Sequence, residues 1–134
     1  MKKIIGIIII SSFFLDGCSS NEQIPNTDLE IARAFIKDIQ ENKFKEAEKF
    51  VLKEETNQQY FDSLKEFYKR KSEKELEKYR DADIVIYEQE NVSDSVTIIN
   101  YSNSYKKEEK NKLKVVKVDG QWMVDLKYTF SGNL

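Results

Sequence analysis

The sequence predicts an α+β domain in which amino-terminal helices pack on one face of an antiparallel four-stranded sheet. Apolar residues recur at helical spacing up to residue 81, and after that position they alternate with a period of two. Asp119-Gly120 lies between two of the alternating segments, and no helical pattern separates any of these segments from the next. Helices followed by a run of strands favour α+β over a parallel α/β fold.

The helical half is predicted to begin with a capping box at Thr27 and Glu30. In this motif the threonine hydroxyl accepts a hydrogen bond from the third helical residue, and the glutamate carboxylate bonds back to the cap. Ser72 and Glu75 repeat the motif before a fourth helix, and Asn42 is the expected end of the first. The apolar positions of the first three helices are Leu29, Ala32, Phe35, Ile36 and Ile39, then Phe44, Ala47, Phe50 and Val51, then Tyr60, Phe61, Leu64, Phe67 and Tyr68.

The second half is rich in Val, Ile, Thr, Tyr and Trp, which suit strands. The four predicted strands are 84–91, 96–105, 110–118 and 121–130. Asp119-Gly120 predicts a two-residue type I′ turn, because both of its central residues need positive φ. The turn sets the register of the last hairpin: Val118 faces Gln121, Val116 faces Met123, Lys114 faces Asp125, Lys117 faces Trp122, Val115 faces Val124 and Leu113 faces Leu126.

This register predicts which face of the sheet is buried. One face is nearly all apolar and carries Leu113, Val115, Trp122, Val124, Leu126, Tyr128 and Phe130. The opposite face carries Lys114 and Asp125, so we expect a cross-strand ion pair there rather than a catalytic aspartate. An uncovered patch of Val116, Val118 and Met123 on that face would instead indicate a surface for assembly.

The first 17 residues are typical of an export signal. Lys2 and Lys3 precede an apolar segment, residues 4–15, which is shorter than the roughly 20 residues of a membrane span and fits the ~7–15 of a secretory signal. The following Leu15-Asp16-Gly17-Cys18 resembles the lipobox of bacterial lipoproteins. Leu15, Gly17 and Cys18 match that motif, whereas Asp16 replaces a residue that is usually small and uncharged.

The lipobox resemblance implies that the chain is cleaved before Cys18 and that the Cys18 thiol receives a diacylglyceryl group. The chain has one cysteine, and the alternative is a free thiol after an ordinary signal peptide, a liability in an oxidising compartment. The expected organisation is a signal peptide at 1–17, a lipidated cysteine and tether at 18–26, and one domain at 27–134. Ser19 after the cysteine favours the outer membrane if the cell has two membranes.

The composition excludes several functional classes. The chain has 134 residues with 22 Lys and Arg against 24 Asp and Glu, which argues against general nucleic-acid binding. It has no histidine, four glycines and no calcium-loop spacing, so neither a metal site, a phosphate loop nor a cofactor is predicted. An active site in this chain would need a carboxylate as its base.

The helices and the closing hairpin together resemble the nuclear transport factor 2-like superfamily, and most of all its small bacterial envelope lipoproteins of unknown function. The residues that carry this resemblance are Leu29, Ala32, Phe35, Phe44 and Ala47 in the helices and Val115, Val116, Lys117, Val118, Asp119, Gly120, Trp122, Val124 and Leu126 in the hairpin. The resemblance covers nearly all of residues 28–130. It implies a cone-like fold with a curved sheet and a cavity that serves catalysis, small-ligand binding or protein contacts in different members.

The leading functional hypothesis is a non-enzymatic, lipid-anchored envelope module that binds a small apolar ligand or an envelope protein. One alternative is a cavity enzyme of the isomerase or dehydratase type with a carboxylate base, and another is an assembly factor that uses the exposed sheet face. The tyrosines that could line a cavity, or equally fill the core, are Tyr60, Tyr68, Tyr79, Tyr87, Tyr101, Tyr105 and Tyr128. The identity of the ligand and the oligomeric state stay open at this point.

Overall fold

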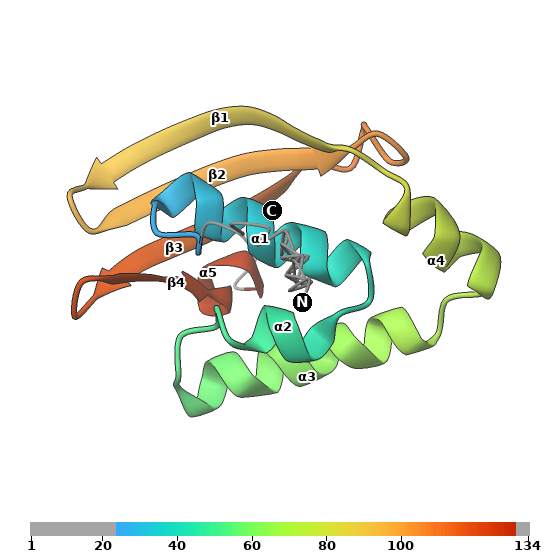
Figure 1. Cartoon of the computed structure of the whole chain (residues 1–134), viewed down its shortest axis with the longest axis horizontal. Coiled ribbons are helices and arrows are strands. Elements are labelled where there is room, and N and C mark those ends of the chain that lie inside the picture. Colours follow the sequence, from blue (N-terminus) through green and yellow to red (C-terminus); the bar gives the residue numbers. More distant parts are fainter. Residues whose placement is uncertain (1–23, 131–134) are drawn as a thin grey trace, which may run out of the picture.

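The computed structural model describes residues 24–130, which form an α+β structure of five helices and four strands (Figure 1). The helices are α1 (Asp28–Gln40), α2 (Phe44–Glu48), α3 (Glu55–Lys69), α4 (Glu73–Arg80) and α5 (Leu126–Phe130). The strands are β1 (Ile84–Ser93), β2 (Val96–Asn103), β3 (Asn111–Val118) and β4 (Gln121–Asp125). They form one antiparallel sheet in the order β1-β2-β3-β4, so the predicted α+β class with a four-stranded antiparallel sheet is confirmed.

Both predicted capping boxes are confirmed. Thr27 Oγ1 accepts a hydrogen bond from Glu30 N at 3.2 Å, and Glu30 Oε2 accepts one from Thr27 N at 3.2 Å. Ser72 and Glu75 make the same pair of bonds at the start of α4. α1 ends at Gln40, and Asn42 has a φ of 60°, so the chain turns where the sequence predicts.

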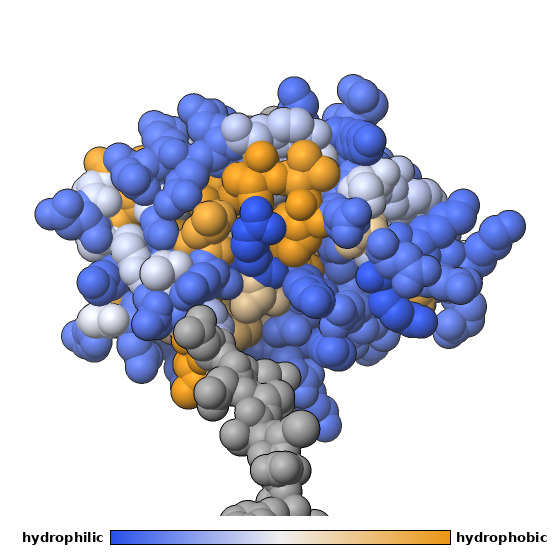
Figure 2. All heavy atoms as spheres, turned by 45° about the horizontal axis from the view of Figure 1, so that its top comes forward, coloured by the Kyte–Doolittle hydropathy of each residue, from blue (hydrophilic) through white to orange (hydrophobic). Residues whose placement is uncertain are grey.

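One cluster of buried side chains joins the helices to the sheet. The predicted stripe of α1 supplies Ala32, Phe35, Ile36 and Ile39, all at most 6% exposed. The predicted apolar face of the sheet supplies Leu113, Val115 and Val124 to the same cluster. The outer surface is mostly hydrophilic, and Figure 2 shows apolar residues gathered near the middle of one face and ringed by polar ones.

The last hairpin follows the predicted turn and register. Asp119 and Gly120 have φ angles of 50° and 80°, as the two central residues of the turn require. β3 and β4 pair Lys114 with Asp125, Val115 with Val124, Val116 with Met123, Lys117 with Trp122 and Val118 with Gln121. Five of the six predicted pairs are therefore confirmed.

The predicted strand 121–130 is too long, because β4 ends at Asp125 and the next five residues form α5. Asn57 Oδ1 accepts a hydrogen bond from Leu126 N at 2.7 Å, and Asp125 Oδ1 accepts one from Lys127 N at 3.2 Å. These two bonds to side-chain oxygens take the place of the backbone hydrogen bonds that a longer β4 would make with β3. The pairing of Leu113 with Leu126 and the strand positions of Tyr128 and Phe130 are accordingly wrong, although Leu126 itself is 1% exposed.

The second predicted helix is also too long. α2 stops at Glu48, and Val51 forms a parallel bridge to Val124 instead of a helical turn. Val124 N donates to Phe50 O at 2.7 Å, and Leu52 N donates to Val124 O at 2.9 Å. The segment after α2 therefore satisfies backbone groups at the free edge of β4, which would otherwise stay unpaired.

The closing turn yields a stability prediction. Gly120→Ala should lower the free energy of unfolding by about 1–2 kcal/mol, because a residue with a Cβ is disfavoured at a φ of 80°. A Cβ at this position meets nothing within 4 Å, so the loss comes from backbone conformation and not from a clash. Urea unfolding measures the effect. Asp119→Asn, which keeps a residue tolerant of positive φ, is the control, and equal stability of all three proteins would contradict the prediction.

Candidate functional site

A pocket of about 370 Å³ lies between the helices and the sheet. Its aliphatic walls are Ile36 and Ile39 of α1, Leu64 of α3, Leu113 of β3 and Leu126 of α5. The elements that build it are therefore far apart in sequence and meet through the common core. A pocket of this size and mainly apolar lining is typical of a small-molecule site.

Aromatic side chains form the α3 and α4 end of this pocket. Phe67 and Tyr68 come from α3, and Tyr79 comes from α4. The Tyr68 and Tyr79 rings meet edge to face with their centroids 5.6 Å apart, a favourable geometry for aromatic pairs. Lys71 Nζ lies 4.2 Å from the Phe67 ring centroid and 4.8 Å from that of Tyr79. Phe67, predicted as a core residue, is 56% exposed, and this lysine covers part of its ring.

Tyr68, Tyr79 and Tyr101 are the members of the predicted tyrosine set that line the pocket. Burial raises the pKa of Tyr101 to about 12, and burial likewise raises the pKa of Tyr68 and of Tyr79. All three hydroxyls are therefore neutral at physiological pH and able to donate hydrogen bonds. Tyr87, by contrast, is 47% exposed and its hydroxyl pairs with Ser102 Oγ at 2.8 Å.

Gln40 is a pocket residue that the sequence analysis misses. Its Nε2 donates to Tyr79 O at 3.2 Å and to Ala82 O at 3.0 Å, so the last turn of α1 is tied to the end of α4. The residue is 5% exposed, and its Oε1 is buried without a hydrogen bond from any residue between 24 and 130. The burial of Gln40 could have been predicted from its position in the sequence. Gln40 follows Ile36 by four residues, so the two side chains share the buried face of α1.

The remaining polar lining residues lie on the strands, the β2–β3 connection, α3 and α5. They are Ser63, Asn103, Glu109, Asn111 and Thr129. Glu109 is the carboxylate of the lining; it is exposed and pairs with Lys106, whose Nζ lies 3.3 Å from Glu109 Oε1. The charged groups of the pocket therefore sit at its rim, and the interior presents neutral amides and hydroxyls.

The structure confirms the predicted ion pair of Asp125. Lys114 Nζ lies 3.7 Å from Asp125 Oδ2, and Asp125 does not line the pocket. Asp125 is more buried than a solvent-facing strand position implies, at 7% exposed, because the chain turns back into α5 immediately after it. On the same sheet face Val118 is 42% exposed, whereas Val116 and Met123 are half-buried.

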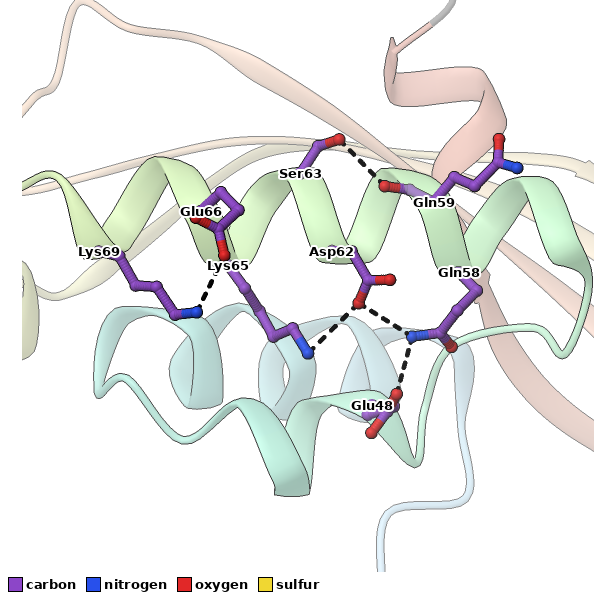
Figure 3. Close-up of polar contacts among 8 residues, drawn as sticks. All are labelled: Glu48, Gln58, Gln59, Asp62, Ser63, Lys65, Glu66 and Lys69. Atoms are coloured by element: carbon purple, nitrogen blue, oxygen red, sulfur yellow. Dashed lines mark hydrogen bonds and ion pairs between the residues drawn. The ribbon is translucent and has the colours of Figure 1, made fainter.

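A second, wider depression of about 630 Å³ lies beside α2 and the start of α3. Its walls include Lys45, Glu48, Lys53, Glu54 and Gln58. Figure 3 shows how such polar groups bond to each other: Gln58 Nε2 donates to Glu48 Oε1 at 2.9 Å and to Asp62 Oδ1 at 3.2 Å. Because these groups satisfy one another at an open surface, this depression is a weaker candidate site than the apolar pocket.

Metal and membrane-spanning features are not found within residues 24–130. The structure brings together no group of three His, Cys, Asp or Glu side chains in this range that could hold a metal ion. No helix in the same range is long and apolar enough to cross a bilayer. The predicted signal peptide and Cys18 lie outside the described residues.

The chain matches no family model, no curated protein and no solved structure. The resemblance to nuclear transport factor 2-like lipoproteins therefore stays a prediction that rests on the residues given above.

The buried tyrosines yield a pH prediction. The unfolded chain ionises its tyrosines near pH 10, whereas folded Tyr101 keeps its proton up to about pH 12. Above pH 10 the unfolded state therefore binds fewer protons than the folded state, and the free energy of unfolding should fall as the pH rises toward 12. Tyr101→Phe should weaken this fall. Urea unfolding across that pH range measures it, and identical pH dependence in both proteins would contradict the assignment.

Proposed function

We propose that this chain is a lipid-anchored envelope lipoprotein whose domain binds a small, mainly apolar ligand in the pocket, without catalysing a reaction on it. The observation that carries the proposal is the pocket of about 370 Å³ with aliphatic and aromatic walls and a few neutral polar groups. At the packing density of protein interiors this volume accommodates on the order of 15 to 20 non-hydrogen atoms.

We also infer the finer architecture, in which the helices cover one face of a curved, cone-like sheet. Support comes from the common core, where Phe35 and Ile36 of α1 belong to one cluster with Ile99, Val115 and Val124 of the strands. The course of the ribbons in Figure 1, with α1 beside the sheet and a bend in its long strands, is consistent with this arrangement. The pocket then corresponds to the cavity that the family resemblance implies.

Binding is favoured over catalysis by the chemistry of the lining. A cavity enzyme of the alternative type would need a carboxylate base close to a tyrosine hydroxyl. The lining carboxylate, Glu109, is near enough to Tyr79 to contribute to the raised pKa of that residue, but it is exposed to solvent and paired with Lys106, which leaves it poorly suited as a base. Asp125 pairs with Lys114 and lies outside the lining. The interior groups that remain are suited to orient a ligand through hydrogen bonds.

The anchor part of the proposal rests on the lipobox and on the start of the domain. Asn26 N and Thr27 N both donate to Glu30 Oε2, at 3.0 and 3.2 Å, so the chain is fixed to α1 from residue 26 onward. Ile24 is 86% exposed and does not belong to the buried core. A tether from residue 19 to 26 spans at most about 26–29 Å when extended, which keeps the domain near the membrane.

Binding in the pocket is tested with the neutral fluorophore N-phenyl-1-naphthylamine. We expect enhanced emission with a Kd in the micromolar range for a ligand of this size. Ser63 lies at the exposed mouth of the pocket, and Figure 3 shows it on the edge of α3 away from α2. Ser63→Trp should therefore obstruct the mouth and weaken binding by about tenfold or more.

The matched control for this experiment is Gln59→Trp. Gln59 lies one turn earlier on α3, is exposed and does not line the pocket, so its replacement should leave the Kd unchanged. Fluorescence titration of the three proteins gives the comparison. No binding to the wild-type protein, or equal weakening by both tryptophans, would contradict the pocket as the ligand site.

The lipid anchor is tested by metabolic labelling with a palmitate analogue in a bacterial host. Wild-type protein should be labelled and recovered with membranes, because two or three acyl chains hold a protein stably on a bilayer. Cys18→Ala should be unlabelled. Cys18→Ser controls for the size of the side chain and should also be unlabelled, and equal labelling of wild type and variants would refute the anchor.

A further inference from the structure

The sheet has a second face, opposite to the buried side chains of Ile99, Leu113 and Val115, and we call it the outer face. Side chains alternate between the two faces of a strand, so Ile98 and Lys114 point to the outer face. Both are half-buried, and the residues that pair with them on β1 are exposed. The middle of the outer face is therefore in contact with solvent in a single copy of the chain.

Two rows of residues across the outer face carry the same order of charges. Each row has a glutamate on β1, a neutral residue on β2 and a lysine on β3. The rows are Glu90–Ile98–Lys114 and Glu88–Asn100–Lys112. The two glutamates form an acidic strip and the two lysines form a basic strip. β2 separates these strips, which are about 10 Å apart because neighbouring strands are spaced by roughly 4.8 Å.

Most charges of the two strips have no ionic partner in a single copy. Glu88, Glu90 and Lys112 make no ion pair with any residue between 24 and 130. Glu88 Oε2 accepts a hydrogen bond from Asn100 Nδ2 at 2.8 Å, which directs the Glu88 carboxylate along the outer face. A second molecule with the opposite order of charges would provide the missing partners.

The outer face of another copy of this chain has that opposite order for one choice of symmetry. Two sheets stacked with two-fold symmetry have their axis in the plane between them. An axis along β2 places β1 of each copy over β3 of the other, so each acidic strip faces a basic strip. An axis across the strands would place β1 over β1 and oppose the glutamates. An axis between β2 and β3 would place Glu90 against Asp125 of the second copy, since Asp125 ends the same row.

The axis along β2 also places apolar groups at the centre of the contact. Val96 and Ile98 are half-buried residues of β2 on the outer face, and each would meet its own counterpart at the axis. The Tyr87 hydroxyl pairs with Ser102 Oγ at 2.8 Å and so covers one end of this face. The free rows span three strands and roughly 20 Å of their length, so the contact buries on the order of 800 Å² in total. This area is small for a specific interface and indicates a weak dimer.

The start of α1 fits the same symmetry. Asp28 Oδ2 accepts hydrogen bonds from Gln89 Nε2 at 3.1 Å and from Thr97 Oγ1 at 2.7 Å, so the tether begins close to the β1–β2 turn. A two-fold axis parallel to the strands leaves both copies pointing the same way, and both tethers start from the same end of the pair. Two chains with the proposed anchor at Cys18 need this arrangement in order to reach one bilayer. Confinement to that bilayer raises their effective concentration.

We propose that the outer face binds a second copy of this chain in a weak two-fold dimer, with the axis along β2 and the acidic strip of each copy against the basic strip of the other. This inference goes beyond the proposed function, because the pocket involves the opposite face of the sheet through Leu113. Ligand binding in the pocket therefore does not depend on it.

The test is sedimentation equilibrium of the full chain in a detergent whose density matches that of the solvent. The wild-type protein should dimerise with a Kd in the micromolar range, and added salt should weaken the dimer. Lys112→Glu should raise the Kd by about tenfold or more, because each new glutamate faces Glu88 of the second copy. The double variant Glu88→Lys with Lys112→Glu should return the Kd to within about threefold of wild type, because the exchanged charges again attract.

Lys74→Glu is the matched control, because it makes the same change of charge at an exposed position of α4 and should leave the Kd unchanged. Ile98→Lys, which brings two lysines together at the axis, should abolish the dimer, and this variant decides the matter if Lys112→Glu fails to fold. A wild-type protein that stays monomeric at millimolar concentration overturns the proposal. A dimer that Lys112→Glu leaves intact, or that the double variant fails to restore, also overturns it.

Discussion

The hydrogen bonds from the Gln40 amide to Tyr79 O and Ala82 O are the contacts on which the pocket depends most. α4 is short, and it brings Tyr79 to the pocket wall while Gln40 fixes its last turn to the end of α1. The Tyr79 ring then packs edge to face on Tyr68 and on Tyr105, at 5.6 and 5.2 Å between centroids. Without the amide, two main-chain carbonyls would lose their donors and the aromatic wall would lose its support.

The other end of the pocket depends on a second long-range side-chain bond. Asn57 of α3 accepts from the backbone of Leu126, and at that point the chain leaves the sheet and begins α5. The turn into α5 places Leu126 and Thr129 in the pocket lining, and Thr129 Oγ1 donates to Lys112 O at 2.8 Å. Had β4 continued as a strand, Leu126 and Thr129 would lie on opposite faces of the sheet, because side chains three residues apart on a strand point in opposite directions. Both ends of the pocket are thus shaped by buried amides.

The local features of the fold could be predicted from the sequence, whereas the long-range contacts that shape the pocket could not. The capping boxes of Thr27 and Ser72 and the turn at Gly120 each depend on residues within four positions of one another, so their signals are complete in a short segment. The bonds of Gln40 and Asn57 join residues 39 and 69 positions apart, and a polar residue inside an apolar stripe indicates nothing about its distant partner. The tyrosines were ambiguous for the same reason, since lining a cavity and filling a core require the same side chain.

The proposed ligand and the proposed anchor support each other physically. A small, mainly apolar molecule partitions into a bilayer, where it is in contact with hydrocarbon instead of water. If Cys18 carries lipid as proposed, a tether that extends to at most about 26–29 Å would hold the domain close to that surface and raise the effective ligand concentration that the pocket meets. A soluble domain with the same pocket would have to collect such a ligand from water, where its concentration is low. The neutral interior of the pocket favours such a ligand, because moving an apolar molecule into it buries apolar surface without burying a charged group.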